Sequence, residues 1–596
     1  MSERQSSSRA RRIGRRAFLG TVPAAVAAGV AVPALAGQAP ARPAGAAPGA
    51  VGQQAESAAR FGVDALKGAE KVIGLEFTGA EEEMMLRGVS RNLDSYDALR
   101  KLDIPLDTEP AITFRPYLPG KRPPAAGPRA KTLKVSAPVV RVTSNLEELA
   151  FQPVAALAPL IRARKVSATA LTKMYLARLK KHGDTLKCVV TLTEELALAQ
   201  AAQADKEIAA GRYRGQLHGI PWGAKDLLAT KGIKTTWGAK PYESQVIDLD
   251  ATVVERLREA GAVLVAKLSM GALAQGGVWF GGSTHNPWNI ERSSSGSSAG
   301  PAAATAAGLV GFAIGTETRG SIMSPSSTCG VTGLRPTYGR ISRYGAMALS
   351  WTMDKIGPIG RTVEDCALAF NAIYGPDGKD DTVVAAPFAW NPDAPLGSLN
   401  IGYIKGDFEP TPRPNMTDEA KKQFEARAAI MKDALEVFRK AGASLVPVEL
   451  PDFPVQAINF ILSAEAAAAF DDLTRSHGID QLTAQGQGDW PNQFRMHRFV
   501  PAVEFIRAQR ARSLLMRKYD ELMSKVHVFL SSTGSASLSA TNLTGHPALC
   551  LKAGFIDKMP TAIMITGRLY DEATLLRVAL AYEQGTKWKE MNPTLS

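Results

Sequence analysis

Two short segments rich in serine and glycine flank an alanine-rich stretch within Arg292–Arg335. The residue types predict a helix over residues 302–307, a short buried strand over 309–314 and a tight turn over 315–321. Small residues let the backbone approach a ligand closely, and the N–H groups of such turns can bind an anion. Hydroxyls combined with backbone donors suit attack by a serine on a carbonyl carbon, which develops an oxyanion.

A serine hydroxyl needs a base before it can attack. The chain has seven histidines, none of them between the two serine-bearing segments, and a Ser-His-Asp triad with distant partners stays open as an alternative. Lys225 is the better candidate, because it lies between a Pro-Trp-Gly turn and an apolar run, on an expected loop that begins at Ile220. A lysine serves as a base only if its pKa falls from ~10.4 towards neutrality, which burial achieves.

Residues Gly296–Gly300 also match G-x-S-x-G, the nucleophile elbow of another hydrolase class. That elbow requires a buried strand immediately before it. Residues 285–292 are expected to form a loop instead, which disfavours this interpretation. A flexible linker is disfavoured as well, because linkers do not carry an apolar run with turn signals on both sides.

Several further motifs follow one another in an order that resembles the amidase signature hydrolases. The resemblance extends from about Leu146 to the C-terminus. Besides the serine-rich loop, the shared motifs are Gly219–Asp226, Gly333–Thr337, Asp354–Pro358, Gly545–Ala548 and Gly567–Arg568. So many motifs in one order are highly specific for this family.

The resemblance implies a role for each residue of the candidate site. Ser321 would attack the carbonyl, Ser297 would relay the proton through an unusual cis peptide arrangement, and Lys225 would accept the proton and return it to the leaving nitrogen. Ser298 would steady Lys225 by hydrogen bonding. The oxyanion hole would be formed by backbone N–H groups of Thr318, Arg319, Gly320 and Ser321. No metal or organic cofactor is implied.

Two residues depart from the family pattern next to the expected nucleophile. Glu317 stands where the family has aspartate, and Arg319 stands where it has glycine. The oxyanion donors belong to the backbone and are retained with both residues, whereas the different side chains alter the wall of the pocket.

Alternation of helical and strand-like segments predicts an α/β fold. The resemblance specifies it as a large mixed β-sheet flanked by many α-helices, with a helical N-terminal extension. We expect residues 1–36 to form a signal peptide, 37–55 a disordered linker, 56–145 the extension and a connector, and 146–596 the amidase domain.

The N-terminus has the pattern of a twin-arginine signal peptide. Arg15-Arg16 and the residues after them precede an apolar run that ends in an A-x-A cleavage site at residues 34–36. Pro23 and Pro33 interrupt this run, which disfavours a membrane anchor. We therefore expect an exported protein, periplasmic or secreted, without stable membrane insertion after signal cleavage.

The net charge is +13, of which residues 1–36 supply six arginines and one glutamate. The remaining lysines and arginines are scattered, so no nucleic-acid partner is expected. Four cysteines form no C-x-x-C pair and predict neither a zinc site nor a disulfide framework.

The leading hypothesis is an amidase that hydrolyses a small carboxylic amide through a serine acyl-enzyme, as a monomer or homodimer. The alternatives are a protein like the amide-generating subunit of a tRNA-dependent amidotransferase, an esterase or carbamate hydrolase on the same fold, and a non-catalytic binding protein on an amidase scaffold.

Overall fold

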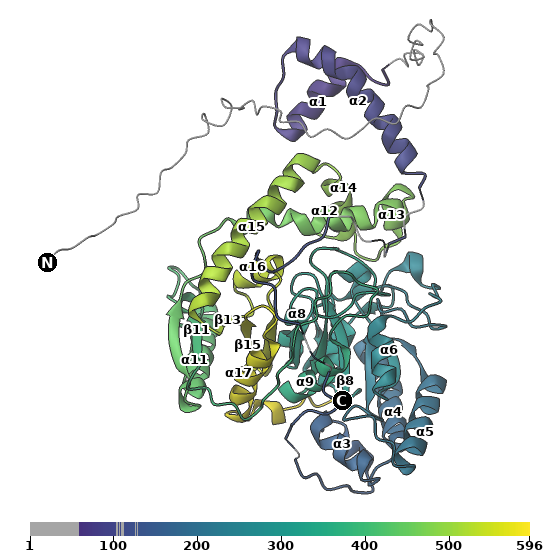
Figure 1. Ribbon diagram of the computed structural model, residues 1–596, viewed down its shortest axis with the longest axis vertical. Coiled ribbons are helices and arrows are strands. Elements are labelled where there is room, and N and C mark those ends of the chain that lie inside the picture. Colours follow the sequence, from purple (N-terminus) through teal and green to yellow (C-terminus); the bar gives the residue numbers. More distant parts are fainter. Residues whose placement is uncertain are drawn as a thin grey trace, which may run out of the picture. The chain divides into compact units, whose positions relative to one another are not determined.

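An eleven-stranded mixed sheet runs through the centre of the structure (Figure 1). The computed structural model describes residues 59–102, 105–106, 108, 112–125, 127, 129–136 and 138–595. The strands, in their order across the sheet, are β1 (Val189–Leu192), β3 (Val263–Leu268), β2 (Pro221–Lys225), β8 (Phe312–Glu317), β10 (Lys355–Gly360), β9 (Thr332–Arg335), β14 (Ala548–Ile556), β15 (Met559–Gly567), β13 (Val528–Ser532), β11 (Asn400–Ile404) and β12 (Ser444–Val448).

Parallel pairing occurs at two places in this sheet. Strand β2 runs parallel to both of its neighbours, β3 and β8, and β11 runs parallel to β12 and β13. All other neighbouring strands are antiparallel. Two small hairpins stand apart from the sheet: β4 (Val278–Trp279) pairs with β5 (Gly282–Ser283), and β6 (His285–Asn286) pairs with β7 (Asn289–Ser293). The mixed sheet confirms the predicted fold class.

Helices flank the sheet over most of the chain. Their bounds are α1 (Val63–Ile73), α2 (Gly79–Leu99), α3 (Val154–Arg162), α4 (Ala168–Leu186), α5 (Glu194–Ala209), α6 (Thr252–Glu259), α7 (Ala299–Ala306), α8 (Met323–Cys329), α9 (Val363–Ile373), α10 (Lys405–Phe408), α11 (Asp418–Lys440), α12 (Phe460–Ala469), α13 (Asp471–Arg475), α14 (Trp490–His497), α15 (Ala502–Lys525), α16 (Ser537–Thr544) and α17 (Glu572–Gln584).

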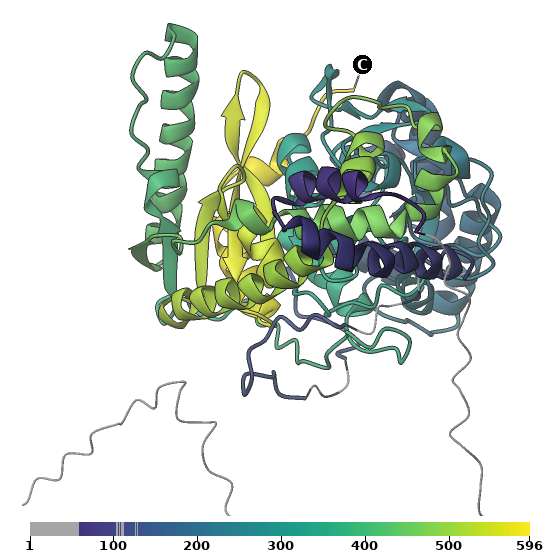
Figure 2. The same ribbon diagram turned by 90° about the horizontal axis from the view of Figure 1, so that it is seen from above.

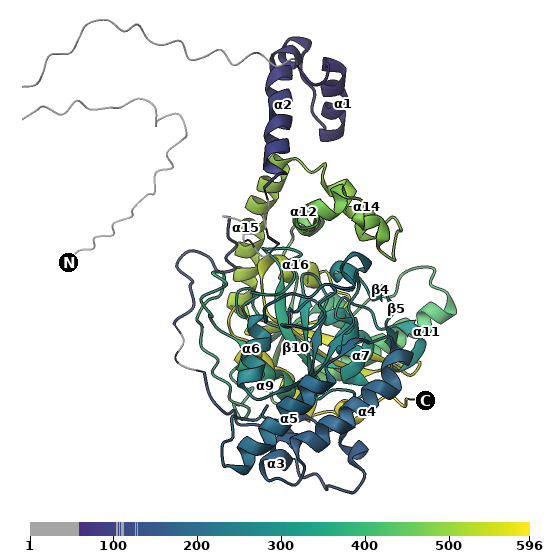
Figure 3. The same cartoon turned by 90° about the vertical axis from the view of Figure 1, so that its right-hand side faces the viewer.

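The helices gather in distinct groups around the sheet. Helices α12, α14 and α15 lie together on one side, and α3, α4 and α5 lie on the opposite side (Figures 1 and 3). Helix α11 lies beside the long hairpin of β14 and β15 (Figure 2). Helices α1 and α2 pack against each other, where the sequence predicts a helical extension.

Helix starts follow the capping signals in the sequence. Ser167 caps α4 by accepting a hydrogen bond from the N–H of Ala170 at 3.0 Å. Thr362 and Asp365 form a reciprocal capping box at the start of α9. The carboxylate of Asp365 also accepts from the N–H of Val154 at 2.7 Å, which ties α3 to α9.

The alanine-rich helix α7 is buried along its whole length against β2, β3, β8 and β10. Small side chains let it approach the sheet closely. A Cβ at Gly300 would lie 2.5 Å from the backbone nitrogen of Ser269, so only glycine fits there. This close packing fixes the residues that come just before the helix.

Two local expectations are wrong. The strand expected at residues 309–314 is β8, which begins at Phe312 and continues to Glu317, so the turn is shorter than predicted. Lys225, expected on a loop, is the last residue of β2. The sequence Pro-Trp-Gly-Ala resembles a turn, but parallel neighbours on both sides hold it in an extended strand.

The predicted signal peptide (1–36) and linker (37–55) lie outside the described residues. Within the described part, no helix is long and apolar enough to cross a membrane.

Candidate active site

Lys225 is the centre of a buried polar cluster. Its side chain is inaccessible to solvent, and its Nζ lies 2.8 Å from Ser297 Oγ, 3.1 Å from Ser298 Oγ and 2.9 Å from Thr316 Oγ1. Among the described residues, no carboxylate forms an ion pair with this amine. Three hydroxyls therefore surround a buried amine that has no counter-charge in contact.

Burial lowers the pKa of Lys225 to about 7, although the negative charges of Asp354 and Glu317 act in the opposite direction. An amine with this pKa exists in both protonation states near neutral pH. It can therefore take a proton from a hydroxyl and give it back within one reaction cycle.

The serine-bearing loop before α7 brings Ser297 to Lys225. The peptide bond between Gly296 and Ser297 is cis, as the family resemblance implies. A Cβ at Gly296 would lie 1.8 Å from the carbonyl oxygen of Gly276, so the loop needs glycine at this position. The loop thus passes directly over a neighbouring backbone segment before it reaches the amine.

Ser298 is held by strand β8 next to Lys225. Its Oγ accepts a hydrogen bond from the N–H of Thr316 at 3.1 Å and donates to the carbonyl of Thr316 at 3.0 Å. A Cβ at Gly315 would lie 2.7 Å from the same Oγ, which explains the glycine in this strand. Because both backbone groups of Thr316 hold Ser298, this serine has a fixed position beside the amine.

Ser321 lies half-buried in the turn between β8 and α8. Its carbonyl accepts a hydrogen bond from the N–H of Ser298 at 3.1 Å, which joins the two serine-bearing loops. The N–H groups of Arg319, Gly320 and Ser321 have no acceptor within the described part of the chain. Gly320 has a φ of +88°, a conformation that suits glycine. Free N–H groups in one turn are what an oxyanion hole requires.

Glu317 stabilises this turn through hydrogen bonds and an ion pair. Its buried carboxylate accepts hydrogen bonds from the N–H groups of Ile322 and Met323 at 2.8 and 2.9 Å, and it pairs with Arg335 at 2.7 Å. Burial alone would raise the pKa of Glu317, but the Arg335 guanidinium and the N–H of Met323 hold it at about 2. The longer side chain is therefore accommodated as a structural anchor for the residues that follow Ser321.

Thr318 and Arg319, the remaining predicted residues, lie in the same turn, but Thr318 is held by hydrogen bonds and Arg319 is exposed. The hydroxyl of Thr318 donates to Asp354 at 2.6 Å, and its carbonyl accepts from Nζ of Lys355 at 3.4 Å. The side chain of Arg319 is exposed and pairs with neither Glu317 nor Asp354. The oxyanion turn is thus fixed by its neighbours rather than by Arg319.

The geometry disfavours both the Ser-His-Asp triad and the nucleophile elbow. All seven histidines are described, and none hydrogen-bonds to a serine of the cluster. His546, for example, is buried and pairs with Thr544. Residues 285–292, expected to be a loop, form most of the β6–β7 hairpin, but β7 is exposed rather than buried. The buried strand that a nucleophile elbow needs is absent from that position.

Sequence reasoning missed two parts of the site. Thr316, which contacts Lys225, is one polar residue in a buried strand, and nothing in its spacing distinguishes it. Asn542 donates to the carboxylate of Glu317 at 2.8 Å from helix α16, more than two hundred residues away. Only the pairing of strands and helices brings such residues together.

Comparison with known proteins places the chain in a family. The sequence profile of the amidase family, described as "Amidase", matches residues 170–539. The chain therefore belongs to the amidase family, as the motifs indicate.

Individual relatives cover most of the chain. The A-subunit of glutamyl-tRNA(Gln) amidotransferase from Chloroflexus aggregans is 34% identical over 497 residues, which span 76% of this chain and 100% of that protein. The corresponding protein of Thermosynechococcus vestitus is 35% identical over 480 residues, or 72% and 97% of the two chains. The crystal structure of the peptide amidase from Stenotrophomonas maltophilia has a TM-score of 0.65 at 30% identity and covers 75% and 99%. The chain is thus an amidase-family enzyme, and these similar proteins include both a peptide amidase and amidotransferase subunits.

The anchoring role of Glu317 gives a first prediction. Glu317→Gln leaves Arg335 buried without a charged partner, and breaking a buried pair in this way costs about 3–5 kcal/mol. A matched control is Glu255→Gln, which removes a half-exposed pair with Lys379 and should cost at most about 1 kcal/mol. Urea unfolding of both variants measures the difference. Equal losses would contradict the anchoring role.

Proposed function

We propose that this protein is an amidase that hydrolyses a small carboxylic amide to an acid plus ammonia or an amine. The observation that carries the proposal is the buried Lys225 amine, with a pKa lowered to about 7 and Ser297 at 2.8 Å. No carboxylate of the described residues contacts this amine, so it does not serve to neutralise a buried negative charge. It can act as the proton carrier that cleavage of a C–N bond requires.

In the proposed mechanism, Ser321 Oγ forms a bond to the carbonyl carbon of the amide. Its proton passes to Ser297 Oγ, while the proton of Ser297 passes to the neutral amine of Lys225. The negative charge on the carbonyl oxygen is stabilised by the N–H groups of Arg319, Gly320 and Ser321. Thr318, the remaining predicted contributor, fixes the start of this turn through its contacts to Asp354 and Lys355.

Collapse of this tetrahedral intermediate breaks the C–N bond. The leaving nitrogen takes a proton back from Lys225 through Ser297, and an ester to Ser321 remains. Water then attacks the ester carbonyl and loses a proton to Lys225 along the same route. The bond between Ser321 Oγ and the acyl carbon breaks, Ser321 regains that proton from Lys225 through Ser297, and the acid is released. Each proton that Lys225 accepts is returned, so the cycle needs no other base.

An amidotransferase A-subunit is the second candidate, and the 34% identity to such a protein over its full length favours it. Hydrolysis of simple amides by the purified chain alone supports the amidase, whereas activity that requires a second, partner protein supports the alternative. Export, which we infer from the arginine pair at residues 15–16, also favours the amidase, and N-terminal sequencing of the exported chain would test it. Matched amide and ester substrates separate an amidase from an esterase.

The nucleophile gives the next prediction. Ser321→Ala should lower kcat on amides by at least ~10³, as removal of a catalytic nucleophile does. The control is Ser327→Ala on the neighbouring helix α8, whose hydroxyl pairs with Thr533 and which should keep most of the activity. Steady-state kinetics on both variants is the measurement. Near-normal hydrolysis by Ser321→Ala would place the nucleophile elsewhere.

The lowered pKa of Lys225 predicts the pH dependence. The amine accepts a proton only when it is uncharged, and the uncharged fraction grows as the pH rises through about 7. The kcat/KM should therefore rise about tenfold per pH unit below this value and level off above it. Lys225→Met should abolish the activity on amides. A flat profile between pH 5 and 9, with Lys225→Met still active, would refute the role of the amine as base.

A further inference from the structure

A small cavity lies next to the oxyanion turn and is not used by the mechanism above. Its volume is about 50 Å³, and its lining includes Thr316, Thr318, Trp351, Asp354 and Lys355. A space of this size holds a few water molecules or one small polar group. Because Thr316 contacts Lys225 and Thr318 begins the oxyanion turn, the cavity borders the proposed reacting centre.

Lys355 is a second buried amine, and its hydrogen-bonding capacity is not used up. It is 3% exposed, and its Nζ donates to the carbonyl of Thr318 at 3.4 Å and to the carbonyl of Met353. In the described part of the chain it forms no ion pair with a carboxylate. An ammonium group has three donors, so one remains for a partner in the cavity.

Trp351 supplies a second unused donor at the same cavity. Its indole N–H is buried and has no acceptor among the described residues. The main chain of Trp351 is held in place, because its carbonyl accepts from Tyr338 at 2.6 Å and from Arg343 at 2.7 Å. A buried donor without an acceptor is costly, and a bound acceptor group would remove that cost.

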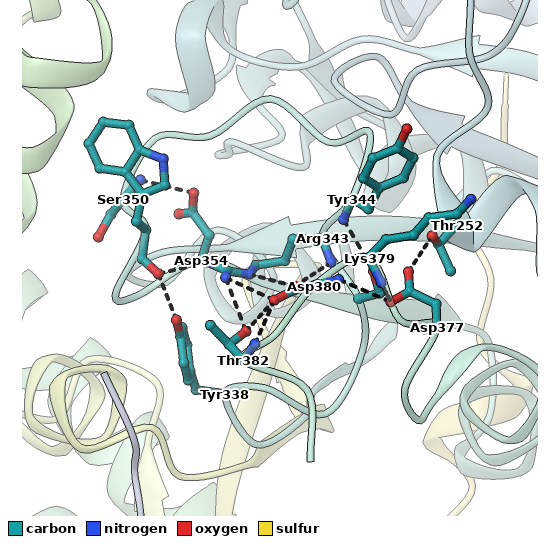
Figure 4. A network of polar contacts seen from close by, with 12 residues as sticks. Thr252, Tyr338, Arg343, Tyr344, Ser350, Asp354, Asp377, Lys379, Asp380 and Thr382 are labelled. Carbon is teal, nitrogen blue, oxygen red and sulfur yellow. Dashed lines mark hydrogen bonds and ion pairs between the residues drawn. The ribbon is translucent and has the colours of Figure 1, made fainter. Parts of the chain in front are cut away.

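The other charged groups that border the cavity already have partners. Arg343 pairs with Asp380, and Lys379 pairs with Glu255. The carboxylate of Asp354 accepts from the hydroxyl of Thr318 and from the N–H groups at positions 349 and 350. Figure 4 shows Asp354 beside Ser350. Lys355 is therefore the cation at this cavity that lacks an anionic partner.

We propose that the cavity binds a carboxylate of the substrate, with Lys355 as its cationic partner and the indole N–H of Trp351 as a second donor. The preferred substrate is then a short amide that carries a free carboxylate near the scissile bond. This inference rests on the proposed amidase function and specifies its substrate class.

The electrostatics of Lys355 agree with this assignment. Burial lowers its pKa well below the ordinary value, and the positive charge of Arg335 acts in the same direction, while Glu317 and Asp354 oppose it. An incoming carboxylate would favour the charged amine and form the missing ion pair inside a water-poor site.

The test compares substrates of equal chain length with and without the carboxylate. Succinamate and glutaramate are set against butyramide and pentanamide, and kcat/KM is measured for each. The wild-type protein should prefer the charged amides by at least tenfold. A hydrogen bond to a charged group contributes about 1.5–3 kcal/mol, so Lys355→Met should reduce this preference by about 10–100-fold, mainly through KM.

Two further variants sharpen the comparison. Trp351→Phe removes the N–H but keeps an aromatic ring, and it should also reduce the preference for the charged amides. Lys379→Met is the matched control, because this lysine borders the same cavity but is paired with Glu255, and it should keep the wild-type preference. Thermal unfolding identifies any variant that does not fold; if Lys355→Met fails, Trp351→Phe decides the outcome.

Binding of succinate, measured by calorimetry on the wild-type protein and Lys355→Met, separates this inference from the proposed function. Binding that requires Lys355 supports the carboxylate site even if no amide is hydrolysed. In that case only the amidase proposal is contradicted. An equal loss of kcat on charged and neutral amides would overturn the inference and leave Lys355 as a residue that positions the Thr318 carbonyl. Amide hydrolysis without any preference for the carboxylate would overturn it as well.

Discussion

The burial of the Lys225 amine without a carboxylate partner is the constraint on which the rest of the site depends. Removing an amine from water favours its neutral form, and here the environment offers hydroxyls in place of a counter-charge. A salt bridge at this position would keep the lysine protonated and prevent it from acting as a base. The fold must therefore exclude both water and carboxylates from one point at the end of β2.

The architecture around that point consists largely of small residues. Glycines at positions 296 and 315 allow a loop and a strand to approach within hydrogen-bonding distance of the amine, and the alanine-rich helix α7 lies directly behind them. The charged groups nearby are kept apart from Lys225 by pairing elsewhere. Glu317 is tied to Arg335 and Asp354 to Thr318, so their charges influence the pKa of the lysine without contacting it.

Much of this arrangement could be predicted from the sequence, because the predictable features are local or are specified by motifs. The Ser167 cap, the Thr362 capping box and the alanine-rich helix follow from residue preferences. The family resemblance predicts the mixed sheet. The Pro-Trp-Gly sequence resembles a turn and predicts a loop at Lys225, whereas parallel pairing with β3 and β8 makes this segment a strand. Contacts such as Asn542 with Glu317 depend on tertiary packing and leave no trace in local spacing.

The central claim is that the turn after β8 carries a serine activated through Ser297 and Lys225. Its most direct test is labelling with a fluorophosphonate, followed by peptide mapping by mass spectrometry. The account predicts one adduct, on Ser321, which forms faster as the pH rises through about 7 and is lost in Lys225→Met. An adduct on another residue, or labelling of Ser321 that is unaffected by Lys225→Met, would contradict it.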